Sequence, residues 1–478
     1  MTRRTARNAA VRAGAEILAK LATLSWTVVA ARQLDPPQFG AFSFALSLVL
    51  LVSALPEWGF DPVVVQRASQ RPEHLPRLHT EALAWQTLLA VPTFVVTALL
   101  ALPARPTTEA AVVLVLLLFA GFPEMWSDTA RASAAARQDQ RGVALALVVQ
   151  RVATAVLVVA ALLSGLGVVG LAMGFLVGTL VGWIFHVRAM HRVRVRVAPR
   201  ALTATGMRAM LTGSGYLGLS SLVLIVLFRV DVVLLGALQN DAAVATYTVS
   251  YRLLETVLFV AYAVNQAVFP VMSAARDGER TRQGLERGLA AAAVVYVPFA
   301  AVALVEPEAV LSLIFGAEYR VASAPVLRWL APVPVLFTMA YLGQSALVAS
   351  DRARSILVAA LAAAFVNIVT NVALIPVLSG VGAAIATTVS YTVMVVLVAL
   401  SLQRVGVGRV RLLRPLHEAA LSAVLFAGLL LALELPLLVE LLLAGSVYVV
   451  GWYALARRYS PEQVAVVLGL VPGFRRRS

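Results

Sequence analysis

Several charged side chains lie inside long apolar stretches, where a charge is expensive. Glu16 and Lys20 are four residues apart, and Arg252 and Glu255 are three apart, so each pair falls on one helix face. A basic side chain at the centre of a membrane helix costs about 2.5–3.5 kcal/mol, so it needs a partner or a wet cavity. These residues could therefore hold helices together as ion pairs, or line a cavity that receives an anion.

Other charges in the apolar stretches have no such simple partner. Arg229 and Asp231 are two residues apart and must point toward different neighbours. Arg151 and Arg328 stand alone in their stretches, and each could extend toward the membrane surface. Paired donors make an arginine guanidinium well suited to phosphate oxygens.

Glu124 and Asp128 form a third acidic group, also inside an apolar stretch. Arg131 follows one helical turn beyond Asp128. This spacing predicts local ion pairing rather than contact with a ligand.

The composition explains where these charges must reside. Hydrophobic residues make up 60% of the 478 residues and charged residues 13%, against about 25% charged in soluble domains. The mean hydropathy is +0.87. Part of this chain must therefore face lipid, and its net charge of +15 reflects membrane topology rather than a nucleic-acid-binding surface. The absence of cysteine excludes disulfides, thiol catalysis and cysteine metal sites.

A membrane span needs roughly 20 helical residues. That length predicts an all-α polytopic membrane protein with fourteen spans, at 11–31, 39–56, 80–102, 110–130, 142–163, 168–187, 209–236, 243–270, 288–305, 323–349, 355–375, 381–402, 415–433 and 436–456. The basic start resembles a signal peptide, but Glu16 and Lys20 interrupt its apolar run. We interpret it as an uncleaved first helix.

The basic residues predict the orientation of these spans. Outer loops contain only Arg32, Arg105 and Arg320 of the 39 Lys and Arg residues, and five more lie within spans. All others fall in alternate, inner segments, as expected for cytoplasmic loops. The pattern predicts a plasma-membrane protein with both termini in the cytoplasm.

An internal similarity divides the chain. The segment FGAFSFALSL from Phe39 matches VATYTVSYRL from Val244, at equivalent helices. We expect a six-helix lobe at 1–196, a second at 197–408, and two more helices with a basic tail at 409–478. Six spans per repeat give both lobes the same orientation, which is a parallel pseudo-repeat around a central cavity.

Several segments are similar to those of known transporters. They are AARQLDPPQFGAFSFALSLVLLVSALPEWGFDPVVVQRA from Ala30, FRVDVVLLGAL from Phe228, NQAVFPVMSAAR from Asn265, LSLIFGAEYRVASAPVLRWL from Leu311 and NIVTNVALIPVLSGVGAAIATTVS from Asn367. Together they resemble Wzx-like oligosaccharide and polysaccharide flippases of the multidrug/oligosaccharidyl-lipid/polysaccharide exporter superfamily. Lipid II flippases and drug antiporters resemble the chain less closely.

The resemblance implies two lobes that open alternately to each side of the membrane. It implies a transporter rather than an enzyme, and a working monomer. The implied cargo is an oligosaccharide on polyprenyl pyrophosphate, moved from the inner to the outer leaflet for surface polysaccharide assembly, with membrane lipids and other assembly proteins as partners. In some relatives the last two helices form a groove for the lipid tail.

The resemblance also selects residues, because the first, seventh and eighth helices line the cavity in relatives. We expect Lys20, Arg229 and Arg252 to bind the pyrophosphate, with Arg12 near the inner mouth. The remaining candidates are acidic, and would orient these cations or couple transport to an ion: Glu16, Asp231 and Glu255. No cofactor or metal is expected, since neither a GxxxxGK[ST] run nor an HExxH run occurs.

Two alternatives remain. A drug or cation antiporter of the same superfamily would predict an acidic cavity, whereas the candidates here lean basic. A membrane enzyme of polysaccharide assembly would need carboxylates and histidines grouped at one face. All five histidines are expected on the cytoplasmic side, without metal-ligand spacing.

Overall fold

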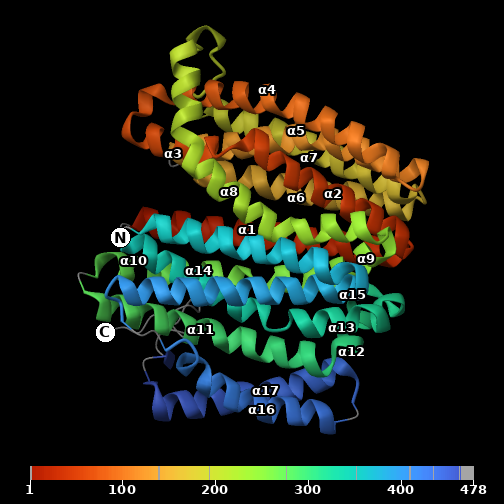
Figure 1. The fold of residues 1–478 in the computed structure, drawn as a ribbon, viewed down its shortest axis with the longest axis vertical. Coiled ribbons are helices and arrows are strands. Elements are labelled where there is room, and N and C mark those ends of the chain that lie inside the picture. The colour runs from red at the N-terminus through yellow and green to blue at the C-terminus, as the bar shows by residue number, and fades with distance from the viewer. Residues whose placement is uncertain are drawn as a thin grey trace. The chain divides into compact units, whose positions relative to one another are not determined.

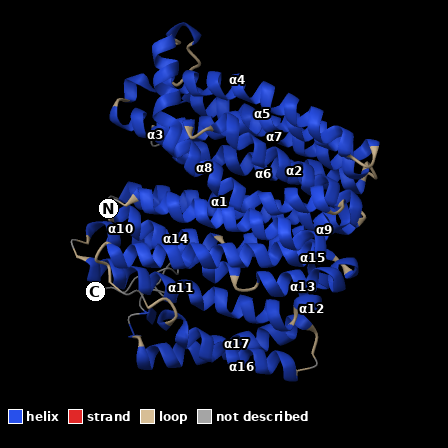
Figure 2. Ribbon diagram, in the orientation of Figure 1, coloured by secondary structure: helices blue, strands red, loops and turns tan. Residues whose placement is uncertain are grey.

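The computed structural model describes residues 3–137, 140–192, 194–275, 277–350, 352–408, 411–433, 435–461 and 463–464. Every regular element in these residues is a helix, and Figure 2 shows no strand among them. Thirteen of the described helices are long and apolar enough to cross a membrane. The prediction of an all-α polytopic membrane protein is confirmed.

The chain divides by its internal contacts into residues 1–245 and 246–478, called here the N-terminal and C-terminal units. The N-terminal unit contains α1 (Arg3–Gln33), α2 (Pro36–Glu57), α3 (Phe60–Gln70), α4 (Leu75–Ala101), α5 (Thr108–Ala136), α6 (Gln140–Leu163), α7 (Gly167–Arg192) and α8 (Ala204–Leu238). The helix α8 packs against α2 and α3 of this unit. The predicted lobe bounds at 1–196, 197–408 and 409–478 stay a prediction. Figure 1 labels these helices.

The helix α9 (Asp241–Val257) crosses the division between the units. The C-terminal unit continues with α10 (Phe259–Ala274), α11 (Gly278–Val305), α12 (Pro307–Phe315), α13 (Arg320–Leu330), α14 (Val333–Ala349), α15 (Ala353–Arg404), α16 (His417–Ala432) and α17 (Leu437–Tyr459). Short 3-10 turns connect several helices, among them η1 (Pro72–His74) and η3 (Pro199–Ala201).

The longest helix accounts for two predicted spans. A straight helix of the 52 residues of α15 would extend roughly 78 Å, far beyond a bilayer core of about 30 Å. Ser379 interrupts it with a left-handed backbone (φ 50°), between the runs predicted at 355–375 and 381–402. The total of fourteen spans stays a prediction.

Small residues bring helices of the N-terminal unit together. Gly174, Gly178 and Gly182 are spaced four apart on α7, and a Cβ on any of them would collide with α6. In lipid, where apolar surface alone gives no driving force for association, such close approach supplies the packing energy. This explains why α6 and α7 lie side by side in Figure 1.

A turn that the sequence did not predict separates α2 from α3. Trp58 and Gly59 both adopt left-handed backbone conformations, which end α2 and start α3 in a new direction. Gly218 of α8 packs directly on this turn, since a Cβ there would lie 2.8 Å from the carbonyl oxygen of Trp58. The part of α8 where Gly218 lies is therefore a packing surface.

The predicted outer loop after α4 is also packed rather than solvated. The Arg105 guanidinium lies over the ring of Phe44, 4.0 Å from its centroid. Its Nη1 is 3.6 Å from Oδ1 of Asp241, and both side chains are largely buried. Gly40 leaves room for the backbone of Asp241 against α2. These contacts attach the first turn of α9 to the N-terminal unit.

The last two helices pack on the C-terminal unit. Phe426 of α16 and Tyr448 and Trp452 of α17 share one buried apolar cluster with side chains of α11. The Tyr448 hydroxyl donates a hydrogen bond to the carbonyl oxygen of Val294, at 3.0 Å. The helices α16 and α17 are therefore anchored by α11.

The contact between Gly218 and the Trp58–Gly59 turn is testable. Gly218→Ala should destabilise the protein by about 1–3 kcal/mol, because the added methyl meets backbone atoms that cannot move freely. Gly215→Ala is the matched control on the same helix, where the methyl enters open space. The thermal unfolding midpoint in detergent should fall only for the first variant; equal midpoints would contradict the packing account.

Candidate functional site

The predicted cationic residues are distributed over both units. Lys20 on α1 and Arg229 on α8 belong to the N-terminal unit, and each side chain is half-buried. Arg252 on α9 belongs to the C-terminal unit. The side chain of Arg12 lies outside the described residues. The gathering of these four cations around one pyrophosphate therefore stays a prediction.

Arg252 has the partner that its spacing predicts. Its Nη1 lies 2.7 Å from Oε2 of Glu255, and both side chains are mostly buried. The Thr256 hydroxyl donates a hydrogen bond to the carbonyl oxygen of Arg252 at 2.7 Å, which stiffens this turn. Arg252 is therefore neutralised and oriented in this conformation, and an anion would have to share or replace the carboxylate.

The acidic candidates of the N-terminal unit have different surroundings. Asp231 is only 1% exposed, and its Oδ1 accepts a hydrogen bond from the backbone N–H of Val232 at 2.8 Å. Glu16 is exposed, and no ion pair joins it to Lys20 in the described part of the chain, so its role stays a prediction. It lies close enough to Arg131 to attract that side chain.

A network of charges joins α5 to α6. Glu124 lies 2.7 Å from Nη2 of Arg151 and accepts a further hydrogen bond from Gln150. Of the two possibilities for Arg151, extension to the membrane surface or an ion pair between helices, the structure shows the ion pair, because α5 supplies a carboxylate beside it. Arg131 forms the predicted ion pair with Asp128 and contacts Gln150. A buried pair of this kind is favourable only when its remaining hydrogen bonds are satisfied, as they largely are here.

A second polar group, missed in the sequence, lies beside this network. The Thr129 hydroxyl is 2.6 Å from Oδ1 of Asp61 and 2.8 Å from Oε1 of Gln86, and Thr129 and Gln86 are fully buried. Asp61 belongs to α3, which is not a candidate span, and burial raises the pKa of its carboxyl to about 6. The available signal was Glu57 and Asp61, four residues apart after an apolar run.

Arg328 is accounted for by the segment between α11 and α14. Its Nη2 lies 3.7 Å from Oε1 of Glu308 on α12, and its Nε donates to the carbonyl oxygen of Leu304 at 3.4 Å. Arg320 approaches the same carboxylate, with its Nε at 3.5 Å. These partly exposed contacts bind α12 and α13 together and give Arg328 a structural role.

Two histidines serve the packing of the N-terminal unit. His79 Nδ1 lies 2.9 Å from the hydroxyl of Ser133, and His186 Nδ1 lies 2.8 Å from the carbonyl oxygen of Gly182. Both rings are buried. Within the described ranges, no three His, Asp or Glu side chains come close enough to share a metal ion.

Comparison with known proteins identifies the fold and its family. The sequence matches the family described as polysaccharide biosynthesis protein over residues 5–276, more than half of the chain. The chain belongs to this family. The family described as lipid II flippase MurJ also matches, over residues 143–453. The resemblance to transporters of this superfamily is confirmed, and the likeness to lipid II flippases is larger than the sequence segments suggested.

Individual relatives of this chain support its assignment to the polysaccharide biosynthesis protein family. The probable flippase AglR of Haloferax volcanii is 30% identical over 166 residues, 34% of the chain. That match spans about a third, 35%, of the curated relative's length. The matches of this chain are to flippases and other transporters, which sets the chain apart from the enzymes of polysaccharide assembly.

The fold is shared with solved transporters. Lipid II flippase MurJ in an inward closed conformation has a TM-score of 0.77 at 12% identity, over 93% of this chain and 98% of that one. An inward-facing multidrug resistance MATE transporter has a TM-score of 0.64 at 17% identity, over 81% and 95%. A transporter of the same superfamily from Pyrococcus furiosus has a TM-score of 0.60 at 16% identity, over 83% and 96%.

The environment of Asp61 in this family member predicts a pH effect on stability. Because burial raises the pKa of Asp61 to about 6, the folded protein holds this proton more tightly than the unfolded chain does. The free energy of unfolding should therefore fall as the pH rises through 6. Asp61→Asn should remove this pH-dependent part of the free energy. The difference between the unfolding midpoints, variant minus parent, should be larger above pH 6 than below it. A difference that does not change with pH would contradict the buried-carboxyl account.

Proposed function

We propose that this protein moves an oligosaccharide linked to polyprenyl pyrophosphate from the inner to the outer leaflet of the plasma membrane, by alternating access. The match to the polysaccharide biosynthesis protein family carries the proposal. The probable flippase among its relatives and the MurJ-like fold support it. The basic residues in every second loop, which lie on one side of the membrane, support an orientation with both termini in the cytoplasm.

The proposed recognition of the cargo rests on charge. Leaving water deprives a pyrophosphate group of its hydration, and fixed cations in a wet cavity can replace it. We assign this role to Lys20, Arg229 and Arg252, with Arg12 at the inner mouth. Asp231, Glu255 and Glu16 would keep the cations oriented while the cavity is empty, as Glu255 does for Arg252.

The energy for outward movement can come from the membrane itself. With the cytoplasm negative, each negative charge moved outward gains about 2.3 kcal/mol per 100 mV. A pyrophosphate carrier would respond to this field without ATP hydrolysis. Coupling to protons or sodium through Asp231 or Glu255 is the other route.

Reconstitution tests the proposed transport directly. The purified protein is placed in vesicles that contain a fluorescent polyprenyl-pyrophosphate oligosaccharide, and a membrane-impermeant quencher reports the labelled lipid in the outer leaflet. We expect transfer between leaflets to be much faster than in vesicles without protein. Equal rates with and without the protein would contradict the flippase proposal.

Substitution of the cationic candidates tests their role. Arg229→Gln and Arg252→Gln should each slow transport about tenfold, since each removes a charged hydrogen bond to the cargo. Arg354→Gln, at an exposed basic residue of α15, controls for the loss of one positive charge. Unchanged transport by folded Arg229→Gln and Arg252→Gln proteins would leave these arginines with structural roles.

A drug or cation antiporter is the second candidate function. It is favoured by the fold shared with MATE transporters and by the acidic groups of the N-terminal unit, Glu57, Asp61 and Glu124. Such a protein would export an organic cation in exchange for protons or sodium ions that enter down their own gradient. Uptake of a fluorescent organic cation by the same vesicles, with no acceleration of the lipid, would favour this alternative.

A further inference from the structure

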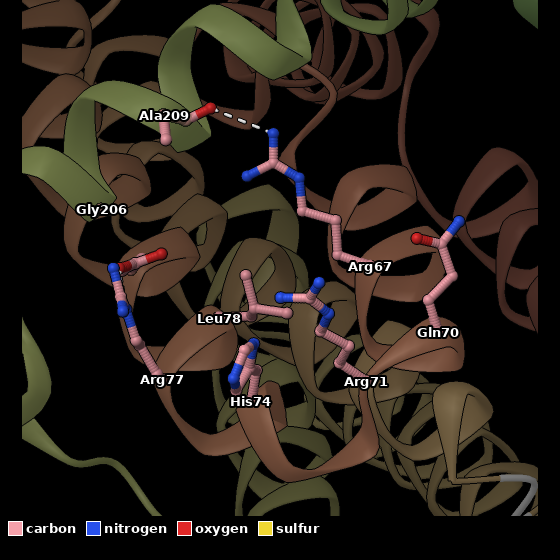
Figure 3. Close-up of a pocket in the computed structure, with 9 residues that line it drawn as sticks. Arg67, Gln70, Arg71, His74, Arg77, Leu78, Gly206 and Ala209 are labelled. Carbon is pink, nitrogen blue, oxygen red and sulfur yellow. Dashed lines mark hydrogen bonds and ion pairs between the residues drawn. The ribbon is translucent and has the colours of Figure 1, made fainter.

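A basic pocket lies within the N-terminal unit, apart from every residue assigned to transport. It has a volume of about 280 Å³, between the end of α3, the η1 turn, the start of α4 and the first turns of α8 (Figure 3). Its basic lining residues are Arg67, Arg71, His74 and Arg77. The arginines come from an inner segment according to the predicted topology, so the pocket opens at the cytoplasmic side.

The arginines at two edges of the pocket are held against α8. Arg67 Nη2 donates to the carbonyl oxygen of Ala209 at 3.1 Å, as drawn in Figure 3. Arg77 Nε lies 2.7 Å from Oε1 of Glu81, and its Nη2 lies 3.3 Å from the Thr203 hydroxyl.

Glycines on α8 make room for these guanidinium groups. A Cβ on Gly213 would collide with Arg67, and a Cβ on Gly206 would collide with Arg77 and Glu81. The two glycines of α8 therefore leave the space that the Arg67 and Arg77 side chains occupy.

The charge of the pocket is not balanced. Glu81 is the single acidic residue in its lining, and this buried carboxylate pairs with Arg77. Arg67 contacts a backbone carbonyl rather than a carboxylate. Arg71 and His74 are exposed and form no ion pair with the described residues. Two arginines therefore remain available to a ligand, which must be an anion.

The helix ends beside the pocket add to its positive potential. Gly206 lies in the first turn of α8, and His74 directly precedes α4, so the N-termini of both helices border the pocket. The Gly206 N–H is bonded to the Thr203 hydroxyl and the Leu75 N–H to the carbonyl oxygen of Pro72, so the contribution that favours an anion there is the helix dipole. The exposed Arg71 guanidinium, the Arg67 guanidinium with only a backbone carbonyl as its partner, and two helix N-termini together fit a phosphate.

The surface of α4 indicates where that phosphate comes from. Spacings of seven and four residues place Leu88, Val95 and Leu99 on the same face of α4 as Glu81. All three are exposed, Leu99 by 69%, as expected of a surface that contacts lipid tails. A lipid whose phosphate occupied the pocket could therefore lay its acyl chains along α4.

We propose that this pocket binds the phosphate of an anionic phospholipid of the inner leaflet, at a site separate from the transported cargo. The lipid would bridge α3, α4 and α8, and so stabilise the N-terminal unit. Its binding does not depend on the proposed transport function.

Thermal unfolding of the full-length protein in a neutral detergent tests the site. Short-chain phosphatidylglycerol is titrated, because a ligand of the folded state raises the unfolding midpoint with its concentration. The midpoint should rise more than with phosphatidylcholine of the same chain length. Arg71→Gln should weaken the apparent affinity about tenfold, through loss of one charged hydrogen bond. The Arg71 side chain forms no ion pair with the described residues, so its replacement should not affect folding.

Arg208→Gln is the matched control, because Arg208 is exposed on α8 and does not line the pocket. Its response to phosphatidylglycerol should equal that of the parent. Equal loss of response in both variants, or no loss in Arg71→Gln, would overturn the proposal. Stabilisation by inorganic phosphate as strong as that by the lipid would overturn the lipid source in favour of a free anion. Arg71-dependent stabilisation by polyprenyl pyrophosphate but not by phosphatidylglycerol would instead make the pocket a cargo site.

Discussion

A bilayer core offers no water to a charged side chain, and this constraint determines most of what is distinctive in the molecule. Every charge kept inside the spans must find its counterpart within the protein. Glu124 therefore pairs with Arg151 between α5 and α6, and Arg252 pairs with Glu255 within α9. Under the proposed transport function, an anionic cargo would take the place of the Glu255 carboxylate beside Arg252.

The absence of a hydrophobic force between helices in lipid shapes the packing in a related way. Close backbone approach has to replace it, and the N-terminal unit achieves this with glycines on α7 and α8. Two other glycines of α8 give space to guanidinium groups, so this helix serves both packing and the placement of positive charge. Gly206 and Gly213 both border basic side chains at the start of α8.

Periodicity and hydropathy predicted the helical fold, because a span needs only a sufficient length of apolar residues. Local pairs such as Arg252–Glu255 and Asp128–Arg131 were also predictable, since helix geometry alone brings residues three apart together. The Glu124–Arg151 pair was not, because it joins two helices whose rotation depends on packing. The turn at Trp58–Gly59 was missed for the same reason: it is stabilised by contact with Gly218 of α8.

The central claim is that intramembrane cations recognise the charged headgroup of a lipid-linked cargo. It is tested most directly by equilibrium binding of two lipids to the purified protein in nanodiscs. One is a polyprenyl-pyrophosphate oligosaccharide, and the other carries the same sugar and chain through an uncharged linkage. The account predicts at least about tenfold tighter binding of the pyrophosphate lipid, the value of one charged hydrogen bond, and a smaller preference at high salt. Equal affinities for the two lipids would contradict it.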